Sequence, residues 1–283
     1  MMLVVCHMGL AGQPAELAPL LPPEQEITRD VRQALVAGDL ARANELSNQL
    51  ADPQRAIWRG LFAIVRNEPA NAIRLLPRTG TPKLLGVAYY MVRQHILFRQ
   101  QMEEAIRTTP ADFGPYYYLG RHYDSDVDNP EEAARWFRQA LERRPDFIRA
   151  RAYLGYCLER SGKMVEAERE YRQSLRIPQS LAGMARLRLA ENDTRGAAEW
   201  IDKAMAAESR DVGIVKLAAR IYADAARRPD SLRALELAAQ LAPRDATVPY
   251  QLWRAYQAIG EPAKAAQAKA AFERLRSIYG MGK

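Results

Sequence analysis

Apolar and small residues recur along this chain at the spacing of one face of an α-helix, and helix start signals divide them into segments. In one such segment Ala133, Phe137 and Ala140 are three or four residues apart, which places them on a single helical face. Asn129 supplies a side chain that can cap the helix start, and Pro130 suits the first helical position. The pattern predicts a helix that begins at Pro130 and buries this apolar face.

The same pattern repeats in windows that start at residues 79, 113, 148, 178, 212 and 246. Each window predicts two helices separated by a turn, with an aromatic residue common at its eleventh position. Every window except the last has small residues at its eighth and twenty-seventh positions, where the last has Trp253 and Phe272. The eighth residues are Gly86, Gly120, Gly155, Ala185, Ala219 and Trp253. Self-similarity at a period of about 34 residues is typical of stacked helix pairs. Small residues at matching places let two helices approach each other closely.

This combination of residues resembles the tetratricopeptide repeat family. The strongest match is the window from 113, with Tyr116, Leu119, Gly120, Tyr123, Ala133, Phe137, Ala140 and Pro145. The resemblance covers about residues 79 to 279. It implies an all-α, right-handed superhelical solenoid of antiparallel helix pairs. It also implies that the first helix of each pair lines a concave surface on which these proteins bind other proteins.

We divide the chain into three parts on this basis. Residues 1–23 form an apolar N-terminal segment and a linker, residues 24–78 two degenerate helical repeats, and residues 79–283 about six repeats with a C-terminal capping helix. Two irregularities stand out. The window from 178 begins only 30 residues after its predecessor, so about one helical turn is missing there. The window from 79 has no evident turn residue, which predicts one continuous helix from Lys83 to Ile106.

Composition narrows the classes of function. The formal net charge is +7, and most of the 41 basic residues are Arg, which permits acidic partners without proving them. Two cysteines exclude a disulfide framework, and three histidines far apart in sequence (His7, His95 and His122) predict no zinc-like cluster. We find no phosphate-binding loop and no nucleophile motif, so we expect no cofactor, no metal and no enzymatic activity. No apolar run is long enough to span a membrane.

The N-terminus leaves the compartment open. Residues 1–10 are apolar apart from His7 and small residues follow, as in a truncated signal peptide, but the segment is short and has no basic start. An export signal would place the protein in the periplasm or outside the cell, and a frayed apolar tail would leave it in the cytoplasm.

The resemblance also places a set of residues on the concave surface. At the ninth position of the windows, Arg recurs in three successive repeats as Arg186, Arg220 and Arg254. The other residues assigned to this groove are Arg121, Tyr156, Tyr117, Lys216 and Tyr250. Guanidinium groups bind carboxylates in a two-point geometry, so the expected ligand is an acidic or carboxylate-bearing segment of another protein. The alternative is that these arginines are ordinary solvated surface residues. The chaperone-binding members use groove asparagines, which are absent at these places, so their specificity is not carried over.

Three further functions remain as alternatives to a protein-binding scaffold. Nucleic-acid binding by the basic face is disfavoured by interleaved acidic residues, and a structural, self-associating role is also open because the sequence leaves the oligomeric state undefined. For catalysis the sequence offers one pair, His122 and Cys157, which share the tenth position of adjacent repeats. Because that position packs between helices and no third orienting residue is evident, we expect a buried structural thiol beside a core histidine.

Overall fold

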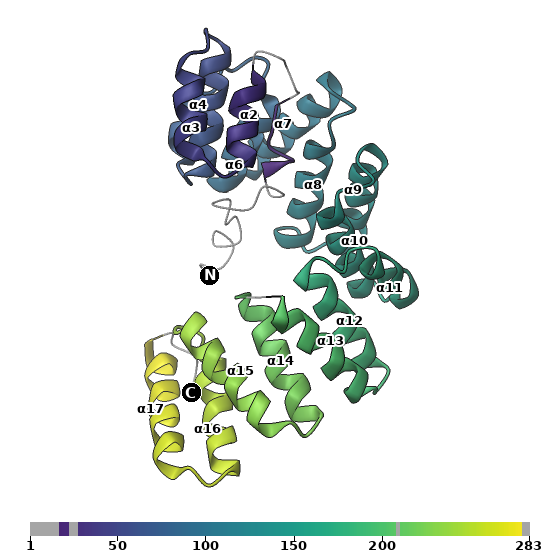
Figure 1. Ribbon diagram of the computed structural model, residues 1–283, viewed down its shortest axis with the longest axis vertical. Helices are drawn as coiled ribbons and strands as arrows, with labels where there is room; N and C mark the ends of the chain where they lie inside the picture. Colours follow the sequence, from purple (N-terminus) through teal and green to yellow (C-terminus); the bar gives the residue numbers. More distant parts are fainter. Residues whose placement is uncertain (1–16, 23–27, 208–209, 279–283) are drawn as a thin grey trace. The chain divides into compact units, whose positions relative to one another are not determined.

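The computed structural model describes residues 17–22, 28–207 and 210–278 (Figure 1). The secondary structure of these residues is helical, and sixteen helices follow one another along the chain. They are α2 (Arg29–Val36), α3 (Leu40–Asn48), α4 (Gln54–Val65), α5 (Pro69–Leu75), α6 (Pro82–Met91), α7 (His95–Thr108), α8 (Phe113–Ser125), α9 (Pro130–Arg143), α10 (Ile148–Arg160), α11 (Met164–Arg172), α12 (Pro178–Ala190), α13 (Thr194–Ala206), α14 (Val212–Asp224), α15 (Arg228–Leu241), α16 (Thr247–Ala258) and α17 (Pro262–Ile278). The all-helical solenoid expected from the sequence is confirmed.

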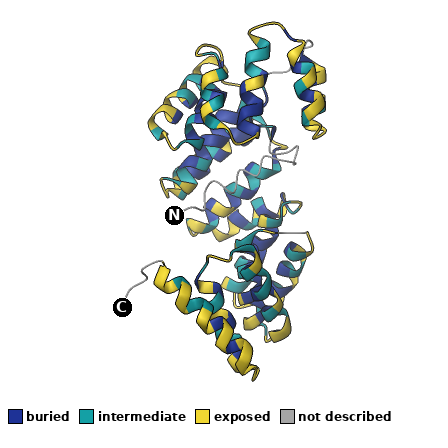
Figure 2. Cartoon of the chain, turned by 90° about the vertical axis from the view of Figure 1, so that its left-hand side faces the viewer, coloured by how far each residue is buried: buried dark blue, intermediate teal, exposed yellow. Residues whose placement is uncertain are grey.

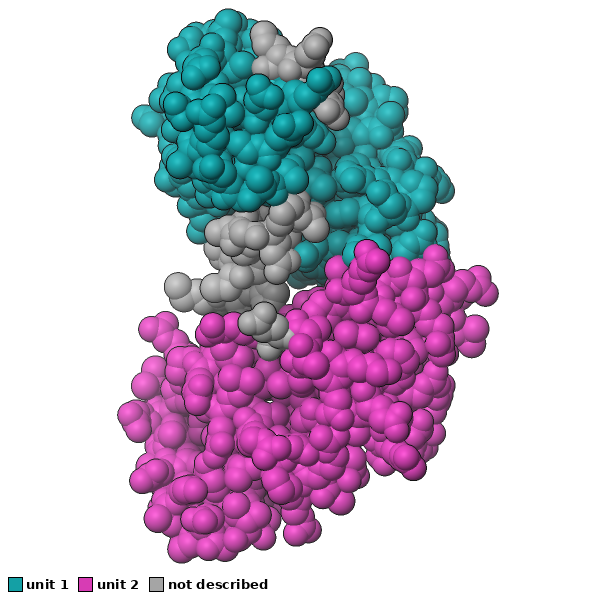
Figure 3. All heavy atoms as spheres, viewed as in Figure 1, with its two compact units in different colours: residues 1–161 teal, residues 162–283 magenta. Residues whose placement is uncertain are grey.

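The chain forms two compact units, residues 1–161 and 162–283 (Figure 3). The first unit contains α2 to α10 and the second α11 to α17. Inside each unit, helices that are consecutive in sequence pack against each other, and first helices of successive pairs, such as α6 and α8 or α12 and α14, also meet. Each repeat therefore buries its apolar face against its neighbours, as expected for a repeat array.

A residue with positive φ stands in the turn inside every helix pair. These residues are Gly38, Asn67, Arg93, Asp128, Gly162, Asn192, Ala226 and Gly260. In the first pair the amide of Asp39 donates to the carbonyl of Ala34 and the amide of Gly38 donates to that of Leu35. These two bonds define the Schellman motif, which satisfies the last carbonyls of a helix by placing one residue in the left-handed conformation.

The continuous helix expected from Lys83 to Ile106 is wrong. Helix α6 ends at Met91, α7 begins at His95, and Arg93 takes φ 60° between them. The amide of Gln94 donates to the carbonyl of Tyr89, as at the equivalent place in the pairs that begin with α2, α4, α12, α14 and α16. An L-residue enters this conformation at a cost of about 1–2 kcal/mol, so the packing of α7 on α6 must compensate for a turn that has no glycine.

Close approach of the paired helices depends on the small residues at the repeated positions. A Cβ atom added to Gly120 would lie 2.7 Å from the ring of Phe137 in the partner helix α9. At the twenty-seventh position, counted past one inserted residue in the window from 113, Ala140, Ala204 and Ala238 are fully buried. The start of α9 is also as expected, because the Asn129 side chain accepts a hydrogen bond from the amide of Glu132 at 3.0 Å.

The second unit begins with a short helix and ends with an exposed one. Helix α11 contains only 9 residues, whereas α13 contains 13, which agrees with the missing helical turn. At the other end, α17 buries only Ala265 and Ala268 and is mostly exposed (Figure 2). Phe272 of α17 packs against Tyr250 of α16, with 5.3 Å between ring centroids. A bulky residue is tolerated there because no described helix stacks on this side.

Candidate functional site

The first-helix faces of the N-terminal unit hold a segment of the protein's own chain. Residues 17–22 pack into the unit with Leu20 fully buried, and Lys83 Nζ donates a hydrogen bond of 2.8 Å to the carbonyl of Leu21. Arg32 donates at 2.8 Å to the carbonyl of Pro22. Gly114, in the second position of α8, touches the carbonyl oxygen of Pro19 so closely that a Cβ there would lie 2.3 Å from it. The interpretation of these residues as a linker is therefore wrong. The three leucines at positions 17, 20 and 21 were the feature of the sequence that could have predicted a packed segment.

Lys83 is the centre of this arrangement. Its ammonium group lies 2.6 Å from the carboxylate of Asp112, and both side chains are largely buried. Burial lowers the pKa of Lys83, and the neighbouring charge of Asp112 partly offsets this effect. Asp112 also accepts a hydrogen bond from the amide of Gly114 and so caps α8. One ion pair therefore fixes the start of α8, the face of α6 and the backbone of the N-terminal segment.

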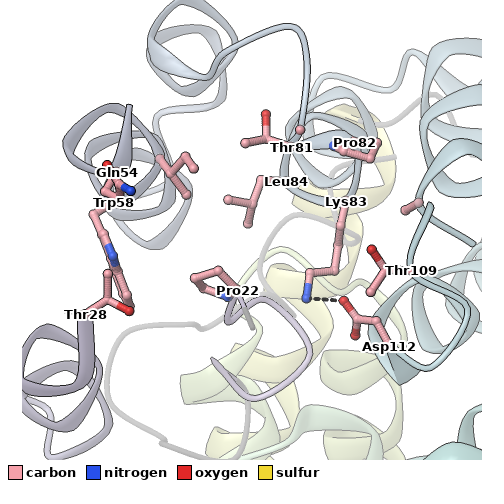
Figure 4. A pocket seen from close by; sticks show the side chains of 13 residues that line it. Pro22, Thr28, Gln54, Trp58, Thr81, Pro82, Lys83, Leu84, Thr109 and Asp112 are labelled. Atoms are coloured by element: carbon pink, nitrogen blue, oxygen red, sulfur yellow. Dashed lines mark ion pairs between the residues drawn. The ribbon is translucent and has the colours of Figure 1, made fainter. Parts of the chain in front are cut away.

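A pocket of about 230 Å³ adjoins this ion pair (Figure 4). Trp58 of α4, Leu84 of α6 and Pro22 supply apolar walls, while Thr28 and the Lys83–Asp112 pair supply polar groups. An apolar cavity with a few fixed polar groups is the usual form of a site that accepts a side chain or a small molecule.

The three predicted groove arginines all lie on first helices of the C-terminal unit. Arg220 is 72% exposed and lies 3.8 Å from Asp224. Arg254 is exposed and donates to the hydroxyl of Tyr250 at 3.3 Å. Arg186 is half-buried and donates to the hydroxyl of Tyr171 at 3.2 Å.

Two other predicted groove residues of this unit make contacts with neighbouring side chains of the protein. Lys216 Nζ lies 2.7 Å from the carboxylate of Asp245 and also donates to the hydroxyl of Thr247 at 3.0 Å. Tyr250 is partly exposed, but its ring packs against Trp253 and Phe272. Lys216 thus links α14 to the start of α16 and stabilises the repeat interface.

The predicted residues of the N-terminal unit differ in accessibility. Tyr117 is buried and packs between Phe137 and Phe147, so its assignment to a contact surface is wrong. Arg121 is half-buried, with its guanidinium 4.5 Å from the centre of the Tyr153 ring. Tyr156 is exposed. The repeat register alone could not separate these cases, because aromatic packing within α8 to α10 covers Tyr117.

His122 and Cys157 do not form a nucleophile–base pair. His122 Nδ1 lies 3.2 Å from Asp126 Oδ2, whereas the Cys157 sulfur lies 3.9 Å from a carboxylate oxygen of Asp124. Burial raises the pKa of the Cys157 thiol, and the negative charge of Asp124 adds to this effect. The thiol is therefore not activated.

Two of the histidines meet in the structure, although the sequence predicts no zinc-like cluster. His95 and His122 stack with 5.2 Å between ring centroids, because the first residue of α7 meets the last turns of α8. Asp126 completes a group of three side chains whose ligand atoms lie within 4.8 Å of one another. His7 and Cys6 lie outside the described residues, as does the proposed export signal.

Comparison with solved structures assigns the fold. A chain of the APC/C hetero-tetramer Cut9–Hcn1 matches 88% of this chain with a TM-score of 0.60 at 12% identity, and this chain spans about 60% of that one. PilF of Pseudomonas aeruginosa matches 71% of this chain, and 91% of its own, with a TM-score of 0.60 at 15% identity. Yeast Tom70 matches 93% of this chain and 64% of its own with a TM-score of 0.58 at 16% identity.

These neighbours are tetratricopeptide-repeat proteins, and the present chain has their fold. No protein-family model matches the sequence, and no curated protein is detectably similar to it. Of the helices in the described chain, none is both long and apolar enough to cross a bilayer.

Proposed function

We propose that this protein is a non-enzymatic adaptor that binds a segment of another protein on the first-helix faces of its repeats. The proposal rests on the observation that residues 17–22 of the chain itself already occupy the first-helix faces of the N-terminal unit. Its main-chain carbonyls at Leu21 and Pro22 accept hydrogen bonds from Lys83 and Arg32, and its leucines fill apolar sites.

Such contacts are suited to an extended or turn-forming peptide. Hydrogen bonds to main-chain carbonyls hold any sequence, and apolar sites select for the spacing of leucine-like side chains. A partner that resembles residues 17–22 would compete with them for the same face. The fold supports this function, since the Cut9–Hcn1 neighbour is an assembly of two different proteins.

The C-terminal unit supplies the chemistry for an acidic partner. Arg220 and Arg254 are exposed, at the same position of successive first helices, and Arg186 precedes them in the same register. Guanidinium groups in this register can bind carboxylates along an extended segment. In the proposal Tyr250 adds contact area on this unit, and Arg121 and Tyr156 add contact area on the N-terminal unit, whereas Tyr117 and Lys216 act inside the protein.

The peptide-binding face can be tested with a synthetic, fluorescently labelled peptide of residues 14–25 (PAELAPLLPPEQ). In the full chain, Leu20→Glu/Leu21→Glu should release the internal segment and leave the face open. We expect this variant to bind the peptide in fluorescence anisotropy at least about tenfold more tightly than the wild type, whose own segment competes. Adding Lys83→Met should weaken that binding. A peptide that carries the same two glutamates is the control, and equal binding of both peptides would refute the proposal.

The acidic partner can be tested by affinity capture with a charge-matched control. The variant Arg186→Glu/Arg220→Glu/Arg254→Glu changes the first-helix face, whereas Arg107→Glu/Arg135→Glu/Arg195→Glu makes the same charge change on second helices, where those side chains are 73–92% exposed. We expect a partner retained by the wild type and the control and lost by the first variant. Equal loss from both variants would indicate nonspecific attraction. Release of the captured partner by nuclease would favour the nucleic-acid alternative. A second copy of the chain as the only captured partner would favour self-association.

A further inference from the structure

Two histidines and an aspartate meet between the third and fourth helix pairs. His95 is the first residue of α7, His122 lies in the last turn of α8, and Asp126 follows directly as the C-terminal cap of α8. His122 Nδ1 and Asp126 Oδ2 lie 3.2 Å apart, and all three residues offer a ligand atom within 4.8 Å of the others. Both helices belong to the N-terminal unit.

The cluster is shielded from solvent. The side chains of His122 and Asp126 are 5% and 6% exposed. Tyr90 covers the group with its ring edge-on to both imidazoles, at 6.3 Å from His95 and 6.2 Å from His122. A carboxylate in such a place requires a compensating charge or several hydrogen bonds.

One buried polar atom at this place, Nδ1 of His95, has no hydrogen-bond partner among the described residues. Buried polar groups without a partner are rare in folded proteins, and a missing ion is one of the causes of such a group.

We propose that His95, His122 and Asp126 bind a divalent transition-metal ion of the zinc type. Two imidazole nitrogens and one carboxylate oxygen are a common three-residue ligand set for Zn²⁺, with bonds of about 2.0–2.2 Å. Tetrahedral bonds of that length place neighbouring ligand atoms about 3.3 Å apart, close to the 3.2 Å between His122 and Asp126. His95 is half-buried at a helix start and offers the third ligand atom within 4.8 Å of the other two.

The donor atoms, two imidazole nitrogens and one carboxylate oxygen, favour an imidazole-binding metal over Ca²⁺ or Mg²⁺. Arg93 lies 3.7 Å from Asp126 with a side chain that is 60% exposed, and it can turn outward when an ion binds. Arg99 adds positive charge near His122. Hard cations prefer sites made of several oxygens, and only one carboxylate is present here. The fourth position of the ion would remain open to water or to a group from a partner.

A bound ion would connect two successive repeats. His95 begins the second helix of one pair, and His122 and Asp126 end the first helix of the next. Because the ligands come from both repeats, metal binding would stabilise the N-terminal unit in the manner of a cross-link.

The proposal can be tested with Co²⁺ and Zn²⁺ on the metal-free full chain. A Cys6→Ser/His7→Ala background removes the other N-terminal donors. We expect one equivalent of Co²⁺ to give the visible absorption of a tetrahedral site, Zn²⁺ to displace it, and either metal to raise the melting temperature. His95→Ala and Asp126→Asn should each weaken binding by more than about tenfold.

The matched control is Asp128→Asn, since that carboxylate is 79% exposed and outside the cluster. It should bind metal as the background protein does. Circular dichroism shows whether each variant is folded. His95→Ala is the decisive variant because His95 is half-buried, so we expect its removal to disturb the core less than removal of the buried His122. Absence of Co²⁺ and Zn²⁺ binding to the background protein, or binding that survives both ligand substitutions, would overturn the proposal.

Discussion

Lys83 holds the backbone of Leu21, which lies 62 residues earlier in the chain, through a hydrogen bond of 2.8 Å. The same ammonium group forms the buried ion pair with Asp112. The N-terminal segment, α6 and the start of α8 are thereby joined at one charged atom. These contacts explain how a lysine can occupy a buried position, and a single substitution there changes all of them.

Replacement of Lys83 by Met should destabilise the N-terminal unit by about 3–5 kcal/mol, because it leaves the Asp112 carboxylate buried without its partner. Lys83→Met/Asp112→Asn should be considerably less harmful, since asparagine keeps the cap of α8 and removes the uncompensated charge. Urea denaturation of both variants measures the difference. Equal losses of stability would show that the ion pair is not the relevant interaction.

Gly120→Ala should destabilise the fold by about 1–3 kcal/mol, because the new Cβ would lie 2.7 Å from the Phe137 ring. The double variant Gly120→Ala/Phe137→Leu should recover part of the loss, since the smaller side chain makes room for the methyl group. Thermal melts of the single and double variants provide the test. A Gly120→Ala protein as stable as the wild type would refute the close-packing account.

Substitutions at two equivalent turn positions should change the stability of the protein in opposite directions. Ala226 has φ 58° and Gly162 has φ 76° at equivalent places in two repeats. Ala226→Gly should stabilise the protein and Gly162→Ala should destabilise it, each by about 1 kcal/mol, because only glycine adopts this conformation without a steric cost. Both can be compared by chemical denaturation. The same direction of change in both variants would contradict the prediction.

The Lys216–Asp245 pair should make the C-terminal unit sensitive to acid. Burial acts to raise the pKa of Asp245, but hydrogen bonds from Lys216 and Thr247 outweigh it and leave the pKa below its ordinary value. A lowered pKa gives a stabilisation that is complete above the unfolded-state value near 3.8 and is lost as the pH falls through the folded-state value. Lys216→Met should therefore cost about 1 kcal/mol at pH 7 and less at pH 3. A cost that does not change with pH would show that packing, not charge, is responsible.

The sequence by itself determined the repeat architecture. Regularly spaced small residues such as Gly120 and Ala140, the capping residue Asn129 and the turn glycines act within one helix pair, so local pattern is enough to define them. Local pattern failed at Arg93, because a non-glycine residue enters the left-handed conformation only when packing of the two helices compensates for the strain.

The tertiary structure decided which of these residues reach a surface and which meet one another. The repeat register assigned both Tyr117 and Arg220 to the groove surface. In the structure aromatic packing buries Tyr117, whereas Arg220 is exposed. Leu21 reaches Lys83, and His95 stacks on His122, only after the helices have stacked. Contacts between repeats depend on the summed positions of many side chains, and spacing along one chain does not encode them.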